Sequence, residues 1–78
     1  MARLRLFAQA REIAGTAGSE IPGATVDAVL AAAVARFGAE FDSLLAHCAV
    51  WVNGEPADRT TQVGPGDEVA VLPPVSGG

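Results

Sequence analysis

One amphipathic helix in the middle of the chain constrains the fold more than any other feature. Thr25 is of the type that caps a helix N-terminus, Asp27 lies in the first turn, where the helix dipole favours negative charge, and Gly38 supplies a C-terminal stop. Between them apolar residues recur every three or four positions: Val26, Val29, Leu30, Ala33, Val34 and Phe37. A helix with one apolar stripe can cover one face of a sheet in a chain of 78 residues, which is enough for one domain.

Segments on both sides of this helix have the patterns of strands. Residues 2–7 alternate arginine with leucine, so Leu4 and Leu6 face the core while Arg3 and Arg5 face the other way. Residues 68–72 form a last strand, with valines on one face and Ala70 and Leu72 on the other. The remaining expected elements are a short helical turn at 8–15, a strand at 19–23, a short helix at 40–46, a strand at 49–53 that ends in an Asn53-Gly54 hairpin turn, and a brief edge strand at 55–58.

This order of elements predicts an α+β roll. The first and last strands are expected to be parallel neighbours at the centre of the sheet, joined by a crossover through the helix. Residues 1–72 would then form the domain, and residues 73–78 an extended C-terminal tail.

Composition and charge exclude several classes of function. Five arginines, no lysine and nine acidic residues give a net charge of -4, which argues against nucleic-acid binding and favours a partner with a basic docking surface. No apolar run approaches the length of a membrane span, and the N-terminus lacks the pattern of a signal peptide, so a cytoplasmic protein is expected. Cys48 is the only cysteine, which excludes an internal disulfide and a two-cysteine metal site, and it is expected to be a buried, inert thiol.

No catalytic group assembles from the remaining residues. His47 and Cys48 are neighbours, and neighbours in a strand point to opposite faces, so His47 is expected to be a surface side chain and not the partner of a nucleophile. Gly64 and Gly66 precede a strand and not a helix, which argues against a phosphate-binding loop. Trp51 is expected in the core, and an exposed Trp51 would instead indicate a docking face.

The C-terminal residues LPPVSGG are the remaining candidate for chemistry. Pro73 and Pro74 restrict the backbone and direct the tail away from the last strand, and Gly77 and Gly78 have no side chains, so the tail can enter a narrow channel. The terminal carboxylate is ionised at neutral pH and can attack an activated phosphate. These features predict a carrier or a substrate, and not an autonomous enzyme.

Two segments carry a resemblance to a known family. Residues 6–15, LFAQAREIAG, and residues 66–78, GDEVAVLPPVSGG, resemble the small, sulfur-carrier subunit of molybdopterin synthase, one of the ubiquitin-like β-grasp sulfur carriers. The similarity extends over essentially the whole chain and includes the Val52–Gly54 turn. It implies a β-grasp roll with a mixed sheet of four to five strands, covered by one main helix.

The resemblance also implies a reaction cycle. A ubiquitin-activating-enzyme-like adenylyltransferase would use ATP and magnesium to adenylate Gly78, and sulfur from a persulfide enzyme would replace AMP, leaving a thiocarboxylate. The large synthase subunit would take this sulfur for the dithiolene of molybdopterin, in a heterotetramer, while the carrier itself would bind no cofactor or metal. By match to the family's motifs, Gly78 carries the sulfur, Gly77 lets the tail pass, and the following residues contact partners: Phe7, Arg11, Leu72, Pro73, Pro74 and Val75.

Several alternatives remain open at the level of sequence. Family members often have an aromatic residue where this chain has Leu72, and core packing is an alternative role for Phe7 and Leu72. A carrier for thiamine or cysteine synthesis would use the same Gly78 chemistry, although thiamine carriers usually lack the PPV segment. A ubiquitin-like modifier and a binding module with an inert tail are further alternatives.

Overall fold

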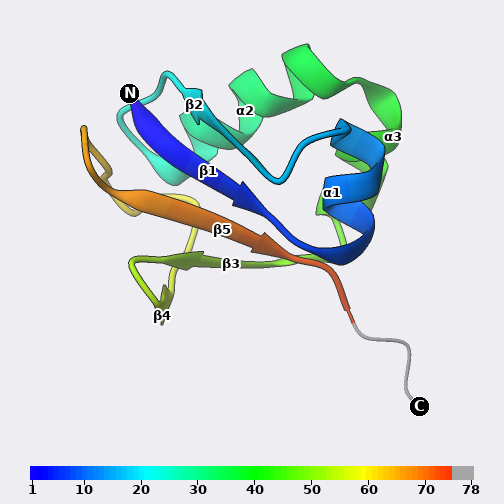
Figure 1. Cartoon of the computed structure of the whole chain (residues 1–78). Coiled ribbons are helices and arrows are strands. Elements are labelled where there is room, and N and C mark those ends of the chain that lie inside the picture. The colour runs from blue at the N-terminus through cyan, green and yellow to red at the C-terminus, as the bar shows by residue number, and fades with distance from the viewer. Residues whose placement is uncertain (75–78) are drawn as a thin grey trace.

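Five strands and three helices follow one another along residues 1–74, the part of the chain that the computed structural model describes (Figure 1). Each element that the sequence predicts is present, with bounds within two residues of those expected. In chain order they are β1 (Ala2–Leu6), α1 (Ala8–Ala14), β2 (Gly18–Ile21), α2 (Val26–Phe37), α3 (Ala39–Leu45), β3 (Ala49–Val52), β4 (Glu55–Pro56) and β5 (Glu68–Leu72).

The sheet has the strand order β2-β1-β5-β3-β4. The first and last strands are parallel neighbours, with Leu4 opposite Val69 and Leu6 opposite Val71, and the other pairs are antiparallel. Because parallel strands need a long connection, the helices belong to the crossover between β1 and β5. The predicted α+β β-grasp architecture is confirmed.

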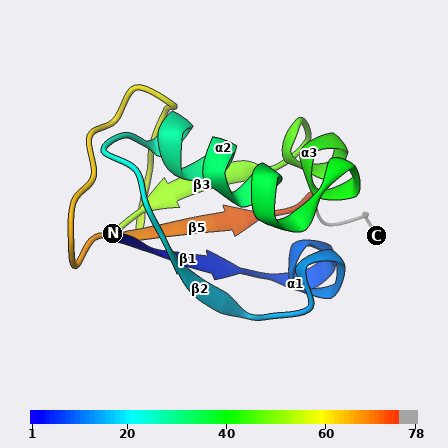
Figure 2. The same cartoon turned by 90° about the horizontal axis from the view of Figure 1, so that it is seen from above.

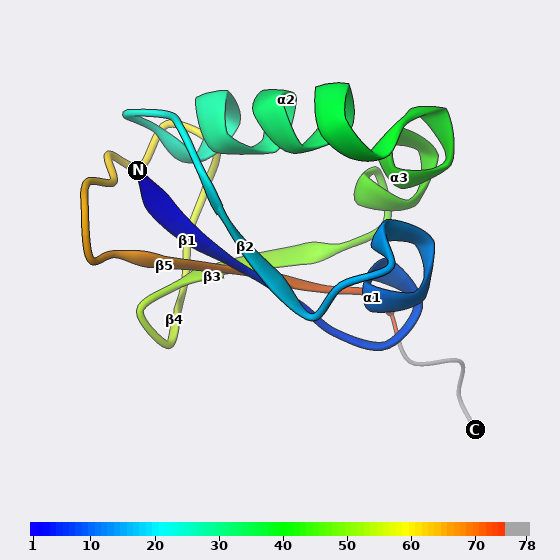
Figure 3. The ribbon, with the colours of Figure 1, turned by 45° about the horizontal axis from the view of Figure 1, so that its top comes forward.

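All three helices lie on one side of the sheet (Figures 2 and 3). α2 and α3 cover it, and α1 packs against α3 at the end of β1. The core between these layers is wholly apolar, and its fully buried side chains include Phe41, Leu4, Ile21, Leu30, Val26, Val29, Val69 and Val71. Alternation along the strands sends their other side chains to the opposite side of the sheet, which no helix of residues 1–74 covers (Figure 1). We call this side the open face.

The junctions of α2 show why its flanking residues are needed. The Thr25 hydroxyl accepts a hydrogen bond from the Ala28 N–H at 3.1 Å, as predicted for the N-cap. Gly23 lies against the same turn with φ of 151°, and a Cβ there would be 2.7 Å from the Val29 nitrogen. A side chain at position 23 would therefore displace the start of the helix.

The Asn53-Gly54 turn is fastened to the start of β5 by side-chain hydrogen bonds. Both turn residues have positive φ, as a type I′ hairpin requires. The Asn53 amide nitrogen donates to Asp67 Oδ1 at 3.0 Å, and its amide oxygen accepts from the Glu68 N–H at 2.9 Å. The other carboxylate oxygen of Asp67 accepts from the Gly64 N–H at 2.8 Å. The Asp67 carboxylate thus links the Asn53 turn and Gly64 to the start of β5.

These bonds predict an acid-sensitive contribution to stability. The Asn53 side chain, and next the Gly64 N–H, lower the pKa of Asp67 below its ordinary value. A lowered folded-state pKa means that the stabilisation is complete above the ordinary carboxyl pKa near 4 and is lost as the pH falls from there through the lowered pKa of the folded state. We expect thermal melting to show a smaller acid-induced loss in an Asp67→Asn variant than in the wild type. An equal loss in both would contradict a role for this carboxylate, and the exposed Glu12, for which Glu12→Gln is expected to change nothing, is the control.

His47 and Cys48 lie in the turn between α3 and β3, so the rule that neighbours in a strand point to opposite faces does not apply to them. His47 is exposed, as predicted. Cys48 is half-buried and not buried, and its thiol donates a hydrogen bond to the Leu44 carbonyl at 3.2 Å. Burial raises the pKa of this thiol, which favours the protonated, unreactive form.

Candidate functional site

The predicted tail begins where β5 ends. Leu72 is the last residue of β5 and is half-buried opposite Ala49 of β3, Pro73 is also half-buried, and Pro74 is exposed. Val75, Gly77 and Gly78 lie outside the described residues. The end of β5 lies at the same end of the molecule as α1 and α3 (Figure 1). The first part of the tail is thus held against the domain, and any partner that takes the tail meets this end of the sheet.

Phe7 lies between β1 and α1, and its side chain is 38% exposed. The core alternative for Phe7 is therefore wrong. The Arg5 guanidinium lies over its ring at 5.4 Å from the centroid, which places the ring beside the open face. Ala8, with φ of 50°, makes the sharp turn from strand to helix. A non-glycine residue rarely adopts this conformation, so the junction is strained.

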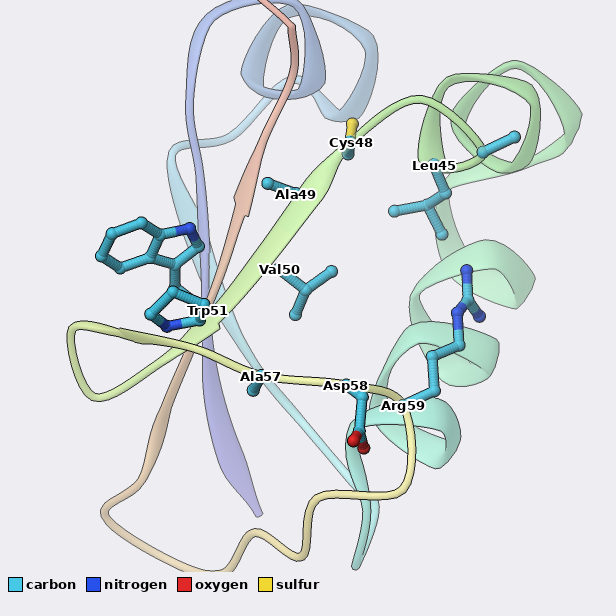
Figure 4. Close-up of a pocket in the computed structure, with 10 residues that line it drawn as sticks. Leu45, Cys48, Ala49, Val50, Trp51, Ala57, Asp58 and Arg59 are labelled. Carbon is cyan, nitrogen blue, oxygen red and sulfur yellow. The ribbon is translucent and has the colours of Figure 1, made fainter.

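Trp51 is 37% exposed on the open face, so the prediction that it packs in the core is wrong. Figure 4 shows its indole on the side of β3 opposite Val50 and Leu45. It is paired with Ala70 of β5, which is paired in turn with Arg5 of β1. The core interpretation failed because both faces of β3 carry apolar residues, so alternation does not show which face is buried.

Four apolar side chains from two strands and one junction gather on the open face, and we call them the apolar patch: Phe7, Trp51, Ala70 and Leu72. Ala49 and Ala70 have small side chains, so the surface is lower there than at the larger side chains beside them. Exposed aromatic side chains of this kind are characteristic of protein interfaces. The patch reaches the residue at which the tail begins.

Two hollows lie near the patch, one beside β3 and one over β1. A groove of about 480 Å³ lies between β3 and residues 56–59, the segment that includes the end of β4 (Figure 4). Its lining residues include Leu45, Cys48, Val50 and Ala57. A hollow of about 450 Å³ lies over β1 and is lined by Arg3, Arg5, Thr16, Ala17, Gly18 and Glu68. We call the second one the arginine hollow.

Arg11 is exposed on α1, and no side-chain hydrogen bond or ion pair holds it within residues 1–74. Arg11 lies one turn after Phe7, whose carbonyl accepts a hydrogen bond from the Arg11 N–H at 3.4 Å, and α1 is at the end of the molecule where β5 ends (Figure 1). Its contact with a partner stays a prediction.

The described residues contain no group of three or more histidine, cysteine, aspartate or glutamate side chains placed to hold a metal ion. Within the same part of the chain, no helix is long and apolar enough to cross a membrane. The geometry that the described residues do offer is an exposed apolar patch that reaches the end of β5.

Comparisons with known proteins agree with this geometry. A sequence model of the ThiS family matches residues 4–78. Among solved structures, SAMP1 from Haloferax volcanii is 34% identical with a TM-score of 0.83, and the alignment covers 99% of this chain and 98% of that one. A putative molybdopterin converting factor, subunit 1, from Pyrococcus furiosus is 27% identical with a TM-score of 0.81, covering 95% and 97%.

A third similar structure, the BexX/CysO complex of Amycolatopsis orientalis, shares the fold at 24% identity, with a TM-score of 0.84 and full coverage of both chains. The family match spans nearly the entire chain, including the residues beyond Pro74. The β-grasp fold, the Gly-Gly sequence and the family match lead to one conclusion. This chain belongs to the ThiS family of ubiquitin-like sulfur carriers.

Proposed function

We propose that this chain is the small, sulfur-carrying subunit of molybdopterin synthase, which acts in the cytoplasm and has Gly78 as its reacting group. The observation that carries the proposal is the placement of Leu72, Pro73 and Pro74. Leu72 ends β5 beside the apolar patch, Pro73 and Pro74 follow it, and the family match extends from there to residue 78. A partner that docks on the patch therefore receives the tail in a defined direction.

In the proposed cycle, the Gly78 carboxylate attacks the α-phosphate of ATP, held with magnesium by a ubiquitin-activating-enzyme-like adenylyltransferase, and pyrophosphate leaves. The outer sulfur of an enzyme persulfide then attacks the Gly78 carbonyl carbon and displaces AMP, which leaves an acyl disulfide. A thiol cleaves the S–S bond of this intermediate, so that Gly78 carries a thiocarboxylate and the thiol ends in a disulfide with the donor cysteine. The large synthase subunit accepts the tail and transfers this sulfur to cyclic pyranopterin monophosphate. Gly77 has the role of passing through the narrow entrance of each partner, because it has no side chain.

In this proposal the domain positions the start of the tail, and the partners supply the catalytic groups. Leu72 stays paired with Ala49, so the start of the tail moves with the sheet. Pro73 and Pro74 remove backbone freedom that the tail would otherwise lose when it enters a partner. We propose contacts of Phe7, Leu72, Pro73, Pro74 and Val75 with these partners, with Arg11 nearby on α1.

The pathway is open to a direct test by reconstitution. Similarity to SAMP1 favours a protein modifier as the second candidate, and similarity to CysO is compatible with a carrier for cysteine synthesis. Thiocarboxylated protein mixed with the large subunit is expected to convert cyclic pyranopterin monophosphate to molybdopterin. Failure there, together with success in thiazole or cysteine synthesis, would overturn the assignment of pathway.

Intact mass spectrometry of the protein from its own host separates the carrier from the modifier. A mass increase equal to one oxygen-to-sulfur exchange at Gly78 supports the carrier. A ladder of conjugates to lysines of other proteins would support the modifier instead. An unmodified tail, in cells that tolerate its deletion, would contradict both.

Truncation of Trp51 is expected to weaken binding to the adenylyltransferase. An interfacial tryptophan truncated to alanine commonly costs about 2 kcal/mol or more, so we expect Kd for Trp51→Ala to rise about 30-fold. Calorimetric titration without ATP measures this, and Gln62→Ala, an exposed residue away from the open face, is the matched control. An unchanged Kd for Trp51→Ala would exclude the patch as the docking surface.

A further inference from the structure

The charged residues beside the apolar patch carry information about the chemistry of the partner. Arg5 lies between Phe7 of the patch and the arginine hollow, with its guanidinium 5.4 Å from the Phe7 ring centroid. It is in the same cross-strand row as Ala70 and Trp51. A protein that covers the patch therefore also covers Arg5.

Covering Arg5 removes the water that now solvates it. The guanidinium has five N–H donors, and none of them makes a hydrogen bond with a residue of the described chain. Its one ion pair, with Glu68, is 3.5 Å long, which is longer than a normal hydrogen bond, and the Arg5 side chain is 50% exposed. A buried guanidinium without acceptors is costly, so a binding partner must supply them.

Arg3 adds a second guanidinium to the same hollow. It faces the same side as Arg5, two residues along β1, and forms no ion pair within residues 1–74 although Glu20 and Glu68 lie opposite it in the neighbouring strands. Thr16 and the Gly18 main chain close the other side of the hollow. The hollow thus presents the guanidinium groups of Arg3 and Arg5, both from β1, beside the carboxylate of Glu68.

The overall charge of the chain does not describe this face. The net charge of -4 favours a basic partner, but the open face carries Arg3 and Arg5 against Glu20 and Glu68, and Arg5 is the charged residue paired with a patch residue, Ala70. The acidic excess belongs to the rest of the molecule. Charge complementarity at the patch therefore differs from that expected of the chain as a whole.

We propose that the partner which takes the tail inserts a carboxylate side chain into the arginine hollow, next to an apolar side chain that packs on Trp51 and Ala70. This inference rests on the proposed function, since it assigns the docking chemistry of that same face. A carboxylate can pair with the Arg5 guanidinium through two parallel hydrogen bonds, which fixes orientation as well as affinity. The occupant is an acidic protein surface, and the arginine pair selects it over partners that are apolar alone.

The test uses the intact carrier and the purified adenylyltransferase of the same host, because every sulfur pathway considered above begins with adenylation. Trp51 is the only tryptophan of the chain, so 5-fluorotryptophan labelling yields a single carrier signal that reports on the patch. We expect Arg5→Ala to raise Kd at least 10-fold, and Arg5→Lys to restore only part of the loss. Added salt should weaken the wild type more than Arg5→Ala.

The control is Arg36→Ala, which makes the same change of charge on α2 and is expected to alter Kd by less than about twofold. If Arg5→Ala and the double variant Arg3→Ala/Arg5→Ala bind as tightly as the wild type, the carboxylate contact is wrong. That result leaves the proposed function intact if the wild type is still adenylated. A wild type that neither binds nor is adenylated would instead overturn the proposed function.

Discussion

Removal of Gly78, or addition of one residue after it, is expected to abolish sulfur transfer and leave the fold intact. One added residue moves the carboxylate by about 3.5 Å, and a misplacement of about 1 Å at a reacting atom can cost about 100-fold in rate. We therefore expect transfer to fall at least about 1,000-fold for both variants. Measurements of acyl-adenylate formation and of thiocarboxylate by mass spectrometry follow the two steps separately.

Stability separates this effect from damage to the domain. Within residues 1–74, no buried core residue lies beyond Val71, so we expect the free energy of unfolding to change by less than about 0.5 kcal/mol. An extra residue before Met1, which is itself exposed, is the matched control and should keep full activity. Full transfer by the extended C-terminus, or a large loss of stability on deletion of Gly78, would contradict the role given to this residue.

Truncation of Phe41 to alanine is expected to bring the domain close to unfolding. Phe41 is fully buried in α3, and its ring lies 5.2 Å from that of Phe37. A buried phenylalanine truncated to alanine costs about 3–5 kcal/mol, because both the burial and the packing around the cavity are lost. A domain of this length has a total stability of only about 4–12 kcal/mol, so the loss is a large fraction of it.

Urea unfolding followed by circular dichroism measures this effect. Phe7→Ala is the matched control, since Phe7 is 38% exposed on the open face and its removal should cost less than about 1 kcal/mol. The two variants are expected to show opposite phenotypes, with Phe41→Ala defective in folding and Phe7→Ala defective in binding the adenylyltransferase. Equal losses of stability would mean that Phe7 also supports the core.

The elements of the fold are well predicted because each has a local physical cause. Thr25 caps α2, the glycine at position 38 ends it, and Asn53 and Gly54 take the positive φ values of a tight hairpin. The parallel pairing of β1 with β5 follows from two strongly patterned strands and one crossover. The tail was also recognisable from sequence, since Pro73 and Pro74 are incompatible with continuing a central strand.

The residues of the open face are only partly predictable from the sequence. Arg3 and Arg5 are assigned to one side of β1 by their alternation with leucine. Phe7 and Leu72 left a choice between core and surface, and Trp51 was assigned to the wrong side. The arginine hollow is not predictable from the sequence, because its lining comes from β1, from β5, and from β2 and the connection before it, and β5 is far from the others in the chain.

By itself the sequence determined the order of strands and helices and the buried side of α2 and β1, because periodicity and capping are local properties. The tertiary structure alone decided which face of β3 is buried. Ala49, Val50, Trp51 and Val52 are all apolar, so alternation cannot distinguish their two faces. Packing of the helices on one side of the sheet makes that choice, and it places Trp51 with Arg5, Phe7 and Leu72 on the other side.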